Sequence, residues 1–337
     1  MHAWQRRTAG AVVAAVGVTF IAVVIVNRLF AVGPAFERMS DGFRPNMKPA
    51  PIGQLQRDLN GLSAVRTEFD AKGVPMLAQA LKLSPEQFRG LMVRRYPDVA
   101  RGMDQLPSVV SQFRGVVGTL QAEQGRFARA DAIPTSNLPA TTVPWGLLAA
   151  GIVLMGLGLL VAIRPRGIGA GLVVALGLLL VAAPLGLSLP QKASAADSMN
   201  DHLKPVYTVQ MLTGARGALA TVGLMGQQMQ TKMLPDLGRQ LGMDQAELHA
   251  FFRRNLPVMA AAMQTMPQSM GRFQSLLKTF DGHLADFDTL TSVAFVPIVW
   301  TMIGGGAVAL LAGLWGLLLV GAKPAMEDAR PVLLKAA

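Results

Sequence analysis

The sequence predicts an all-α integral membrane protein with four transmembrane helices, built as two tandemly duplicated halves that each carry an extracytoplasmic helical domain. Three observations predict this fold class. Four long apolar runs divide the chain, short basic segments flank them, and many residues recur after a shift of 160 positions. With 51% hydrophobic side chains and a mean hydropathy of +0.39, the 337 residues are too apolar for an ordinary soluble protein.

Each apolar run has the length that a helix needs to cross a hydrocarbon core of about 30 Å. Residues 1–9 precede the first run, and the expected spans are residues 10–32, 144–163, 168–189 and 293–321. Asn27 and Arg28 interrupt the first run near its end. Pro297, near the start of the fourth run, indicates a kink or an interfacial turn.

Basic residues in the short flanking segments set the predicted orientation. They lie in the N-terminus, in the loop 164–167 and in the tail 322–337: Arg6, Arg7, Arg164, Arg166, Lys323, Arg330 and Lys335. An even number of spans places these segments on one side of the membrane, and an excess of Lys and Arg marks that side as cytoplasmic. We therefore expect a multi-pass protein of the plasma membrane with both termini in the cytoplasm, and with segments 33–143 and 190–292 outside.

A cleaved signal peptide is the alternative for the first run, because Arg6 and Arg7 precede an apolar stretch that small residues follow. The duplication argues against cleavage. The equivalent apolar run, residues 168–189, is internal, so it cannot be an ordinary signal peptide.

The duplication is strongest in a shared motif, M-x-D-x-[FL]-[RK]-P, and in aligned prolines. The motif is formed by Met39, Asp41, Arg44 and Pro45, and again by Met199, Asp201, Lys204 and Pro205. Further prolines align as Pro75 with Pro235, Pro97 with Pro257 and Pro107 with Pro267. The first span falls on the third and the second on the fourth. Such a parallel repeat predicts a pseudo-twofold axis along the membrane normal.

The motif is interpreted as a junction just outside the first and third spans. Asp41 or Asp201 would cap the following helix, and Arg44 or Lys204 would meet lipid headgroups. A binding determinant is the alternative interpretation of the same residues.

The two outer segments have helical patterns. Ser84 followed by Pro85 and Gln87 predicts a helix start with a capping box, and Asp244 followed by Glu247 is its counterpart. Pro107 and Pro267 are expected to begin or kink long helices that lead back to the membrane. We expect each segment to form a small bundle whose first and last helices continue the membrane helices.

Methionine and histidine are the residues that suggest chemistry. The methionines form two stripes, Met225, Met229 and Met233, then Met259, Met263, Met266 and Met270. Core or partner packing is the favoured interpretation, with contact to a hydrophobic ligand or Cu(I) binding as alternatives. His202, His249 and His283 lack metal-ligand spacing, so we expect solvated or capping roles rather than a zinc site. The chain has no cysteine.

These patterns favour a non-enzymatic protein without cofactor or metal, which presents two exported helical domains to a partner as an accessory, scaffold or assembly factor of a bacterial cell envelope. Expected partners are membrane lipids and a protein or a second copy. The net charge of +11 is dispersed, which argues against nucleic acid. No catalytic motif occurs, and the spans carry no ionisable residue except Arg28, whereas an ion-coupled transporter usually needs such groups. The alternative is binding or transport of a lipid or other hydrophobic ligand in a groove between the halves.

Overall fold

The computed structural model describes residues 2–133, 138–163 and 167–321, and these residues form helices and no strand. The structure confirms an all-α chain with four helices that are long and apolar enough to cross a membrane. They cover Arg7–Val26, Thr142–Ile163, Ile168–Gly186 and Phe295–Leu318. The predicted loop 164–167, except Gly167, and the tail 322–337 lie outside the described residues, together with their basic side chains.

The chain divides into two compact units. The described residues of Met1–Glu37, Ala128–Ser198 and Asp288–Ala337 form the membrane unit, and Arg38–Phe127 with Met199–Phe287 forms the helical unit. The helical unit therefore contains most of both outer segments. Each unit is considered by itself below.

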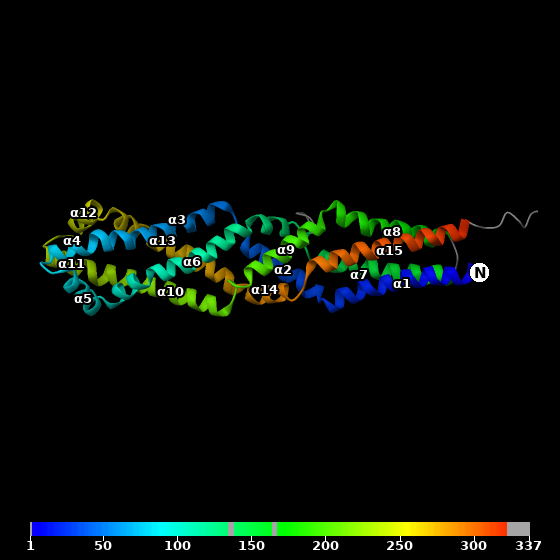
Figure 1. The fold of residues 1–337 in the computed structure, drawn as a ribbon, viewed down its shortest axis with the longest axis horizontal. Coiled ribbons are helices and arrows are strands. Elements are labelled where there is room, and N and C mark those ends of the chain that lie inside the picture. Colours follow the sequence, from blue (N-terminus) through cyan, green and yellow to red (C-terminus); the bar gives the residue numbers. More distant parts are fainter. Residues whose placement is uncertain (1, 134–137, 164–166, 322–337) are drawn as a thin grey trace, which may run out of the picture. The chain divides into compact units, whose positions relative to one another are not determined.

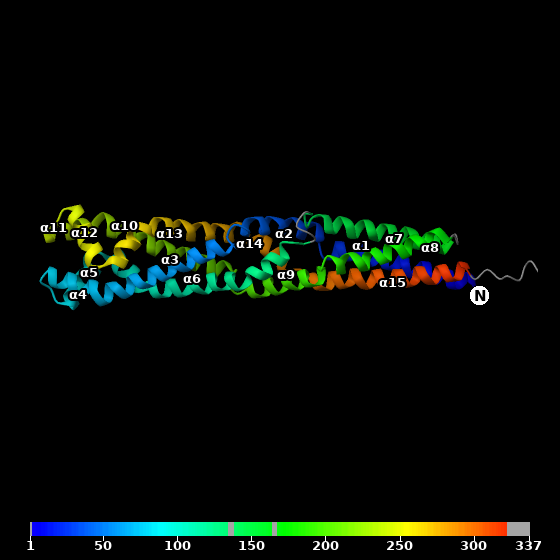
Figure 2. The same cartoon turned by 90° about the horizontal axis from the view of Figure 1, so that it is seen from above.

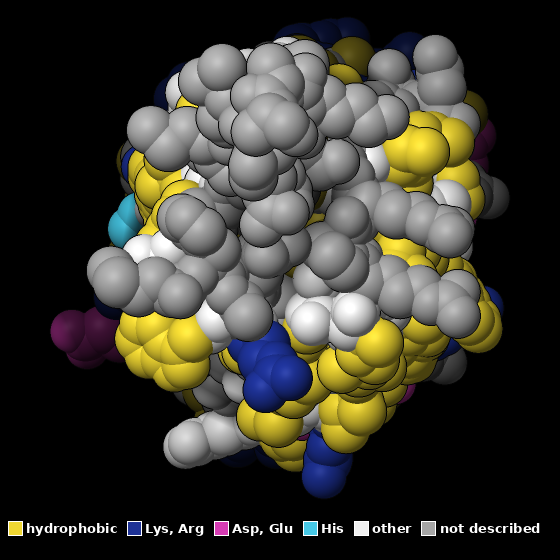
Figure 3. All heavy atoms as spheres, turned by 90° about the vertical axis from the view of Figure 1, so that its right-hand side faces the viewer, with side chains coloured by type: hydrophobic (Ala, Val, Ile, Leu, Met, Phe, Trp, Pro, Cys, Tyr) yellow, Lys and Arg dark blue, Asp and Glu magenta, His cyan; other side chains and the backbone are white. Residues whose placement is uncertain are grey.

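The membrane unit is built on α1 (His2–Val26), α7 (Thr142–Ile163), α8 (Gly167–Gly186) and α15 (Phe295–Gly321). Helix α1 packs on α7 and α15, and α8 packs on α15 and α7, so the four helices lie side by side (Figures 1 and 2). Large apolar side chains remain exposed on them, including Ile152, Leu172, Leu179 and Leu311. Figure 3 looks at the face where α1 begins, and hydrophobic side chains with a few Lys and Arg among them cover much of the described surface.

Two helix pairs in this unit approach each other closely through glycine. A Cβ added to Gly17 of α1 would lie 2.5 Å from the carbonyl oxygen of Gly151 in α7. A Cβ on Gly177 of α8 would lie 2.9 Å from the carbonyl oxygen of Gly306 in α15. Close backbone contact at small residues is typical of packed membrane helices. Gly17 falls on Gly177 in the repeat register, but Gly151 falls beyond Gly306, so the second and fourth spans do not match in the ungapped register that the sequence predicts.

The first and third spans end earlier than predicted. Helix α1 ends at Val26, and Arg28 has a φ of 49° before α2 (Leu29–Phe43) begins. Helix α8 ends at Gly186, and Ser188 has a φ of 54° before α9 (Leu189–Leu203) begins. Both residues adopt a left-handed conformation that is uncommon outside glycine. The expectation that the membrane helices continue directly into the outer helices is therefore wrong at these two breaks.

The helical unit contains two sets of helices in the same order. The first helical set is α3 (Pro49–Glu68), the π-helix η1 (Phe69–Gly73), α4 (Val74–Ala80), α5 (Pro85–Arg95) and α6 (Pro97–Ala130). The second helical set is α10 (Val209–Gln228), the π-helix η2 (Met229–Met233), α11 (Leu234–Leu241), α12 (Gln245–Asn255) and α13 (Pro257–Gly282), followed by α14 (Leu284–Thr291). The elements from α10 to α13 all begin at the position that the repeat register assigns to their counterparts. Two positions that the shift of 160 superposes are called equivalent below.

Local signals explain several helix ends. The side chains of Ser84 and Gln87 form the predicted capping box of α5, and Asp244 and Glu247 form that of α12. The two long helices begin at Pro97 and Pro257. Pro107 and Pro267 lie inside them, so the alternative in which these prolines begin the helices is wrong. Pro297 lies in the first turn of α15, where a missing N–H leaves no helix bond unmade.

The two sets are joined by reciprocal hydrogen bonds. The buried carboxylate of Glu68 accepts a bond of 2.8 Å from the backbone N–H of Met259, at the start of α13. The equivalent Gln228 accepts a bond of 3.1 Å from the N–H of Val99, which is equivalent to Met259. Each set therefore uses the same position to bind the same position of the other, as in an isologous interface.

Candidate functional site: a pocket in the second helical set

The predicted junction motif lies at the ends of α2 and α9. Met39 and Met199 are buried, with exposed fractions of 4% and 5%. Asp41 pairs with Arg44 at 2.7 Å, and Asp201 pairs with Lys204 at 3.7 Å. Pro45 and Pro205 follow in the turns after the helices. The paired side chains are mostly exposed, so these ion pairs contribute little stability.

The expectation that Asp41 and Asp201 cap the following helices is wrong. The residue that precedes α3 is Lys48, which makes no capping side-chain bond, and Thr208 caps α10 through its hydroxyl. Both aspartates are still inside the preceding helix, and the nearby basic side chain offers a closer partner.

Two acidic residues outside the motif bind the chain at the starts of the returning spans instead. Asp197 accepts hydrogen bonds from the backbone N–H groups of Phe295 (2.8 Å) and Val296 (2.9 Å) at the start of α15. The equivalent residue, Glu37, accepts bonds from the N–H and the hydroxyl of Thr141, which precedes α7. A carboxylate at this position accepts hydrogen bonds from N–H groups that have no partner within the helix, and its negative charge interacts favourably with the helix dipole. Sequence reasoning missed these residues, although both are acidic and each lies just before a methionine of the motif.

The three histidines of the second segment do not converge. His202 contacts Glu123, its Nδ1 lying 2.9 Å from Oε1. His283 contacts Asp286 at 3.2 Å, and Arg38 pairs with the same carboxylate at 2.5 Å. Burial raises the pKa of Asp286, but the bonds from Arg38 and His283 outweigh it and the pKa lies below its usual value. Within the described part of the chain, no group of three His, Asp or Glu residues is placed to hold a metal ion.

The first methionine stripe lies in the core between the two sets. Met225, Met229 and Met233 are buried, with exposed fractions of 3%, 6% and 0%. Met225 and Met229 line a small apolar cavity together with Val65 and Phe69, their equivalents in the first set. The cavity has a volume of about 30 Å³, which is room for little more than one water molecule. This burial fits core packing, and the cavity is too small for a lipid chain.

A larger pocket opens in the second helical set. It has a volume of about 430 Å³ and lies between η2, α11, α12 and α13. Its wall includes apolar side chains, among them Leu234, Leu248, Phe252 and Met263. Ligand pockets in proteins commonly have volumes from about 300 to 1,000 Å³, so this cavity has the size of a binding site.

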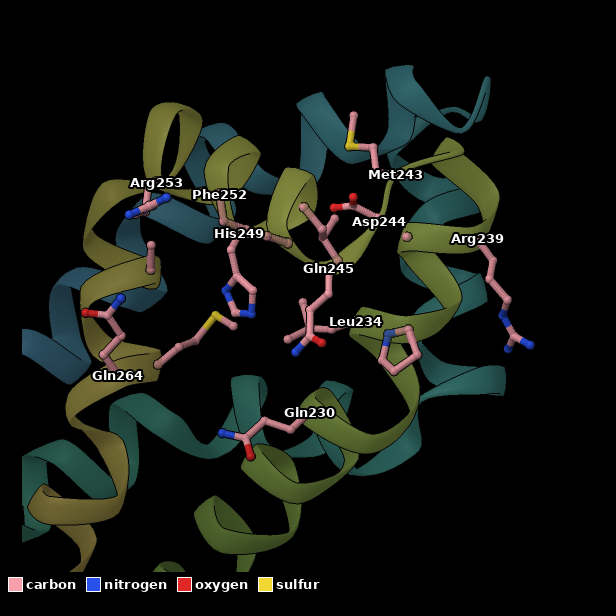
Figure 4. A pocket seen from close by; sticks show the side chains of 15 residues that line it. Gln230, Leu234, Arg239, Met243, Asp244, Gln245, His249, Phe252, Arg253 and Gln264 are labelled. Carbon is pink, nitrogen blue, oxygen red and sulfur yellow. The ribbon is translucent and has the colours of Figure 1, made fainter.

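Neutral polar side chains line this pocket (Figure 4). His249 and Gln245 extend from α12 toward Gln230 of η2, and Gln264 of α13 lies on the opposite side. Arg253 lies at the rim, and Arg239 points away, where it forms an ion pair with the carboxylate of Asp236. That hydrogen bond lowers the pKa of Asp236. Asp244, the acidic residue in the wall, accepts the N–H of Glu247 as the cap of α12.

The equivalent place in the first helical set is occupied by an ion-pair cluster. Arg66 forms ion pairs with Asp70 at 2.5 Å and with Asp104 at 3.6 Å, and it donates to the carbonyl oxygen of Met103. The equivalents of Arg66, Asp70 and Asp104 are Gly226, Gln230 and Gln264. The second set therefore lacks the arginine that crosses this place in the first, and both carboxylates are replaced by amides. Alignment of the two halves with a shift of 160 residues shows these three differences. Only the contacts in the structure show that the first-set residues form an ion-pair cluster.

Comparison of the chain with protein-family models and with curated proteins finds no match.

Proposed function

We propose that this chain is a non-enzymatic integral membrane protein of the bacterial cell envelope, and that it presents an exported helical body to a protein partner as an accessory, scaffold or assembly factor. The reciprocal bonds of Glu68 and Gln228 carry the proposal. Polar groups at these positions are committed to joining the two helical sets, as a rigid presenting body requires. Membrane lipids surround the spans, and the partner is a different protein or a second copy of this chain.

The proposed placement is the plasma membrane, with both termini cytoplasmic and the helical unit outside. The basic residues of the N-terminus, the 164–167 loop and the tail support this orientation through the excess of Lys and Arg on the cytoplasmic side. The described part of the helical unit contains no span-length apolar helix, in agreement with an aqueous location.

A tandem duplication is proposed as the origin of the two halves. The helix starts that recur in one register support it, as do the left-handed residues Arg28 and Ser188, which are equivalent. The returning spans fit the same scheme if the second connector is slightly shorter than the first, as the Gly151 and Gly306 contacts indicate.

Co-purification from native membranes tests the proposal. The tagged full chain is cross-linked in intact cells, solubilised and purified, and its bound proteins and lipids are identified by mass spectrometry. We expect one stoichiometric protein partner, or cross-links between copies, that involve surface residues of the helical unit. A chain that is recovered alone at every cross-linker length would contradict the proposal.

A second candidate function is binding of a lipid-like molecule, and one cavity of the membrane unit favours it. The cavity has a volume of about 80 Å³ and an almost wholly apolar wall that includes Val32, Phe36, Ala193, Phe295 and Ile298. It has room for the end of a hydrocarbon chain. Substitution of Ala193 by Phe would fill it, so this candidate predicts that a lipid which co-purifies with the wild-type chain is lost from the variant. Equal lipid content in both would count against it.

A further inference from the structure

We propose that the pocket of the second helical set binds a short segment of polypeptide chain, through neutral peptide groups and one apolar side chain. This inference rests on the proposed function, because it states which chemical groups of the proposed partner bind to the helical unit. It concerns the pocket between η2, α11, α12 and α13.

The hydrogen-bonding groups of the pocket match a peptide backbone. Gln230, Gln245 and Gln264 each offer an amide with donor and acceptor capacity, and a peptide unit likewise has one donor and one acceptor. His249 adds a ring nitrogen of either kind. Asp244 is engaged as a helix cap, so the wall presents no carboxylate dedicated to a cationic ligand.

The apolar part of the wall suits an aliphatic side chain better than a sugar ring. The Phe252 ring is only 1% exposed, so its face is not open for the stacking that commonly binds a sugar. Met263 and Leu234 are partly exposed and line the cavity. Methionine adapts its shape to varied apolar groups. The wall can therefore accept one apolar side chain beside the amides.

The contrast between the two sets argues that the pocket is a specific feature of the second. In the first set, Arg66 joins Asp70 and Asp104 across the equivalent space. In the second set, Gln230 and Gln264 line the pocket without charge, and the position equivalent to Arg66 is Gly226, which has no side chain to join them. Without a bridging arginine, the two amides can form hydrogen bonds with a neutral ligand. In the first set, the charged groups of Arg66, Asp70 and Asp104 pair with one another instead.

The experiment follows methionine methyl groups by NMR. The full chain, labelled at the methionine methyl carbons and placed in lipid nanodiscs, is titrated with blocked tripeptides acetyl-Ala-X-Ala-amide, where X is Leu, Ile, Val, Met or Phe. We expect at least one of them to shift the methyl signals of Met263 and Met243, which line the pocket. The signal of Met103, which is equivalent to Met263, should stay in place.

Two matched variants exchange the residues at three equivalent positions between the sets. The triple substitution G226R/Q230D/Q264D should weaken binding about tenfold or more, because two of the amides that bind the peptide are lost and the carboxylates that replace them can pair with the new arginine. A Cβ at position 226 would lie 3.2 Å from the sulfur of Met266, so this flexible side chain has to shift in the triple variant. The reverse substitution, R66G/D70Q/D104Q, removes the ion-pair cluster but keeps Pro85 and Arg89 at the positions equivalent to Gln245 and His249, so the Met103 signal should still not respond to the peptides. Unchanged Met233 signals verify the fold of each variant.

The outcomes separate the inference from the proposed function. No shift at Met263 with any blocked peptide, equal shifts at Met103 and Met263, or a response only to the acidic probe acetyl-Glu-Leu-Glu-amide would overturn the inference. A partner that still co-purifies with the triple variant would also overturn the pocket as its docking site, while the presenting function would stand. Absence of any partner, with peptide binding intact at Met263, would instead remove the presenting function.

Discussion

Phe113 and Phe273 meet edge to face with their ring centroids 5.0 Å apart, although they belong to different helical sets. Because the two residues are equivalent, each ring contacts its own counterpart. Two equivalent residues can contact each other only beside the axis that relates the two helical sets, so this ring pair marks the centre of the interface between the sets. Both rings are almost fully buried.

Replacement of Phe113 by Ala should destabilise the protein by about 3–5 kcal/mol, because a large buried ring is lost and a cavity remains. Phe273→Ala should cost a similar amount. The double variant should cost less than the sum, since both single changes remove the same contact. Thermal unfolding in detergent measures all three. Val93→Ala, at an exposed position, is the control and should change stability by less than about 0.5 kcal/mol. If the loss in the double variant equals the sum of the two single losses, the two rings do not stabilise each other.

Tyr96 of the first set donates a hydrogen bond of 3.0 Å to Asp236 of the second. Burial, together with this bond, raises the pKa of Tyr96 to about 12. A raised pKa means that the folded state holds the proton more tightly. The contribution to stability is therefore complete below pH of about 10, the ordinary tyrosine value, and is lost as the pH rises toward 12.

Tyr96→Phe should therefore cost about 1.5–3 kcal/mol near neutral pH. It should also flatten the decline in stability between pH of about 10 and 12. Chemical unfolding at a series of pH values compares the variant with the wild type. If the two curves remain parallel through this alkaline range, Tyr96 is not the group that titrates there.

Asp236 should make a separate contribution at low pH. Its pKa is lowered, chiefly by the hydrogen bond from Arg239, so the stabilisation is present above the ordinary aspartate value of about 4 and is lost as the pH falls below it. Asp236→Asn should reduce the dependence of stability on pH below about 4. An unchanged acid limb would contradict this role.

The orientation predicts the reactivity of single cysteines, which the cysteine-free chain makes easy to introduce. Ser108 and Ser275 lie at exposed positions of the helical unit. Cysteine at either site should react with a membrane-impermeant thiol reagent in intact cells, and cysteine at position 167 should react only after lysis. The opposite pattern would reverse the proposed topology.

The methionine core predicts tolerance to substitution. Met229→Leu conserves volume and apolar character at a buried position, so it should cost less than about 1.5 kcal/mol. Purified protein should contain no stoichiometric copper or zinc by elemental analysis. A one-to-one metal content that disappears in this variant would show that the methionines bind metal.

The caps of the returning spans predict a graded loss. Asp197→Ala should destabilise the protein by about 0.5–2 kcal/mol, because the N–H groups of Phe295 and Val296 lose their acceptor. Asp197→Asn retains an acceptor oxygen and should cost less. Thermal unfolding of both variants in detergent checks the order, and equal losses would mean that the side chain acts through charge alone.

Local chemistry explains which parts of the fold were predictable. Hydropathy identifies the four spans, and the Ser84 and Asp244 boxes mark helix starts within a few neighbouring residues. The breaks at Arg28 and Ser188 were not predicted, since neither residue type favours a positive φ and each break lies beside an apolar run. The cap formed by Asp197 joins two segments that are far apart in the sequence, which no local pattern reveals.

The candidate pocket depends on non-local contacts in the same way. The polar residues of the pocket form no known motif, and they come from three different helices: Gln230 from η2, Gln245 and His249 from α12, and Gln264 from α13. The difference between Arg66 and the equivalent Gly226 is visible in the sequence, but the sequence gives no sign that Arg66 pairs with Asp104 of another helix. That contact depends on how the helices pack against each other, which the sequence pattern of a single helix does not show.

The reciprocal bonds between Glu68 and Met259, and between Gln228 and Val99, impose an order on biosynthesis. When the ribosome has completed the first helical set, the acceptor at Glu68 and the apolar side chains beside it still await a partner that belongs to the second set. At elongation rates of about 5–20 residues per second, the 129 residues from Ala130 to Met259 take roughly 6–26 s. If the helical unit is exported as proposed, the apolar surface of the first helical set stays uncovered during this interval, when a chaperone outside the membrane could bind it.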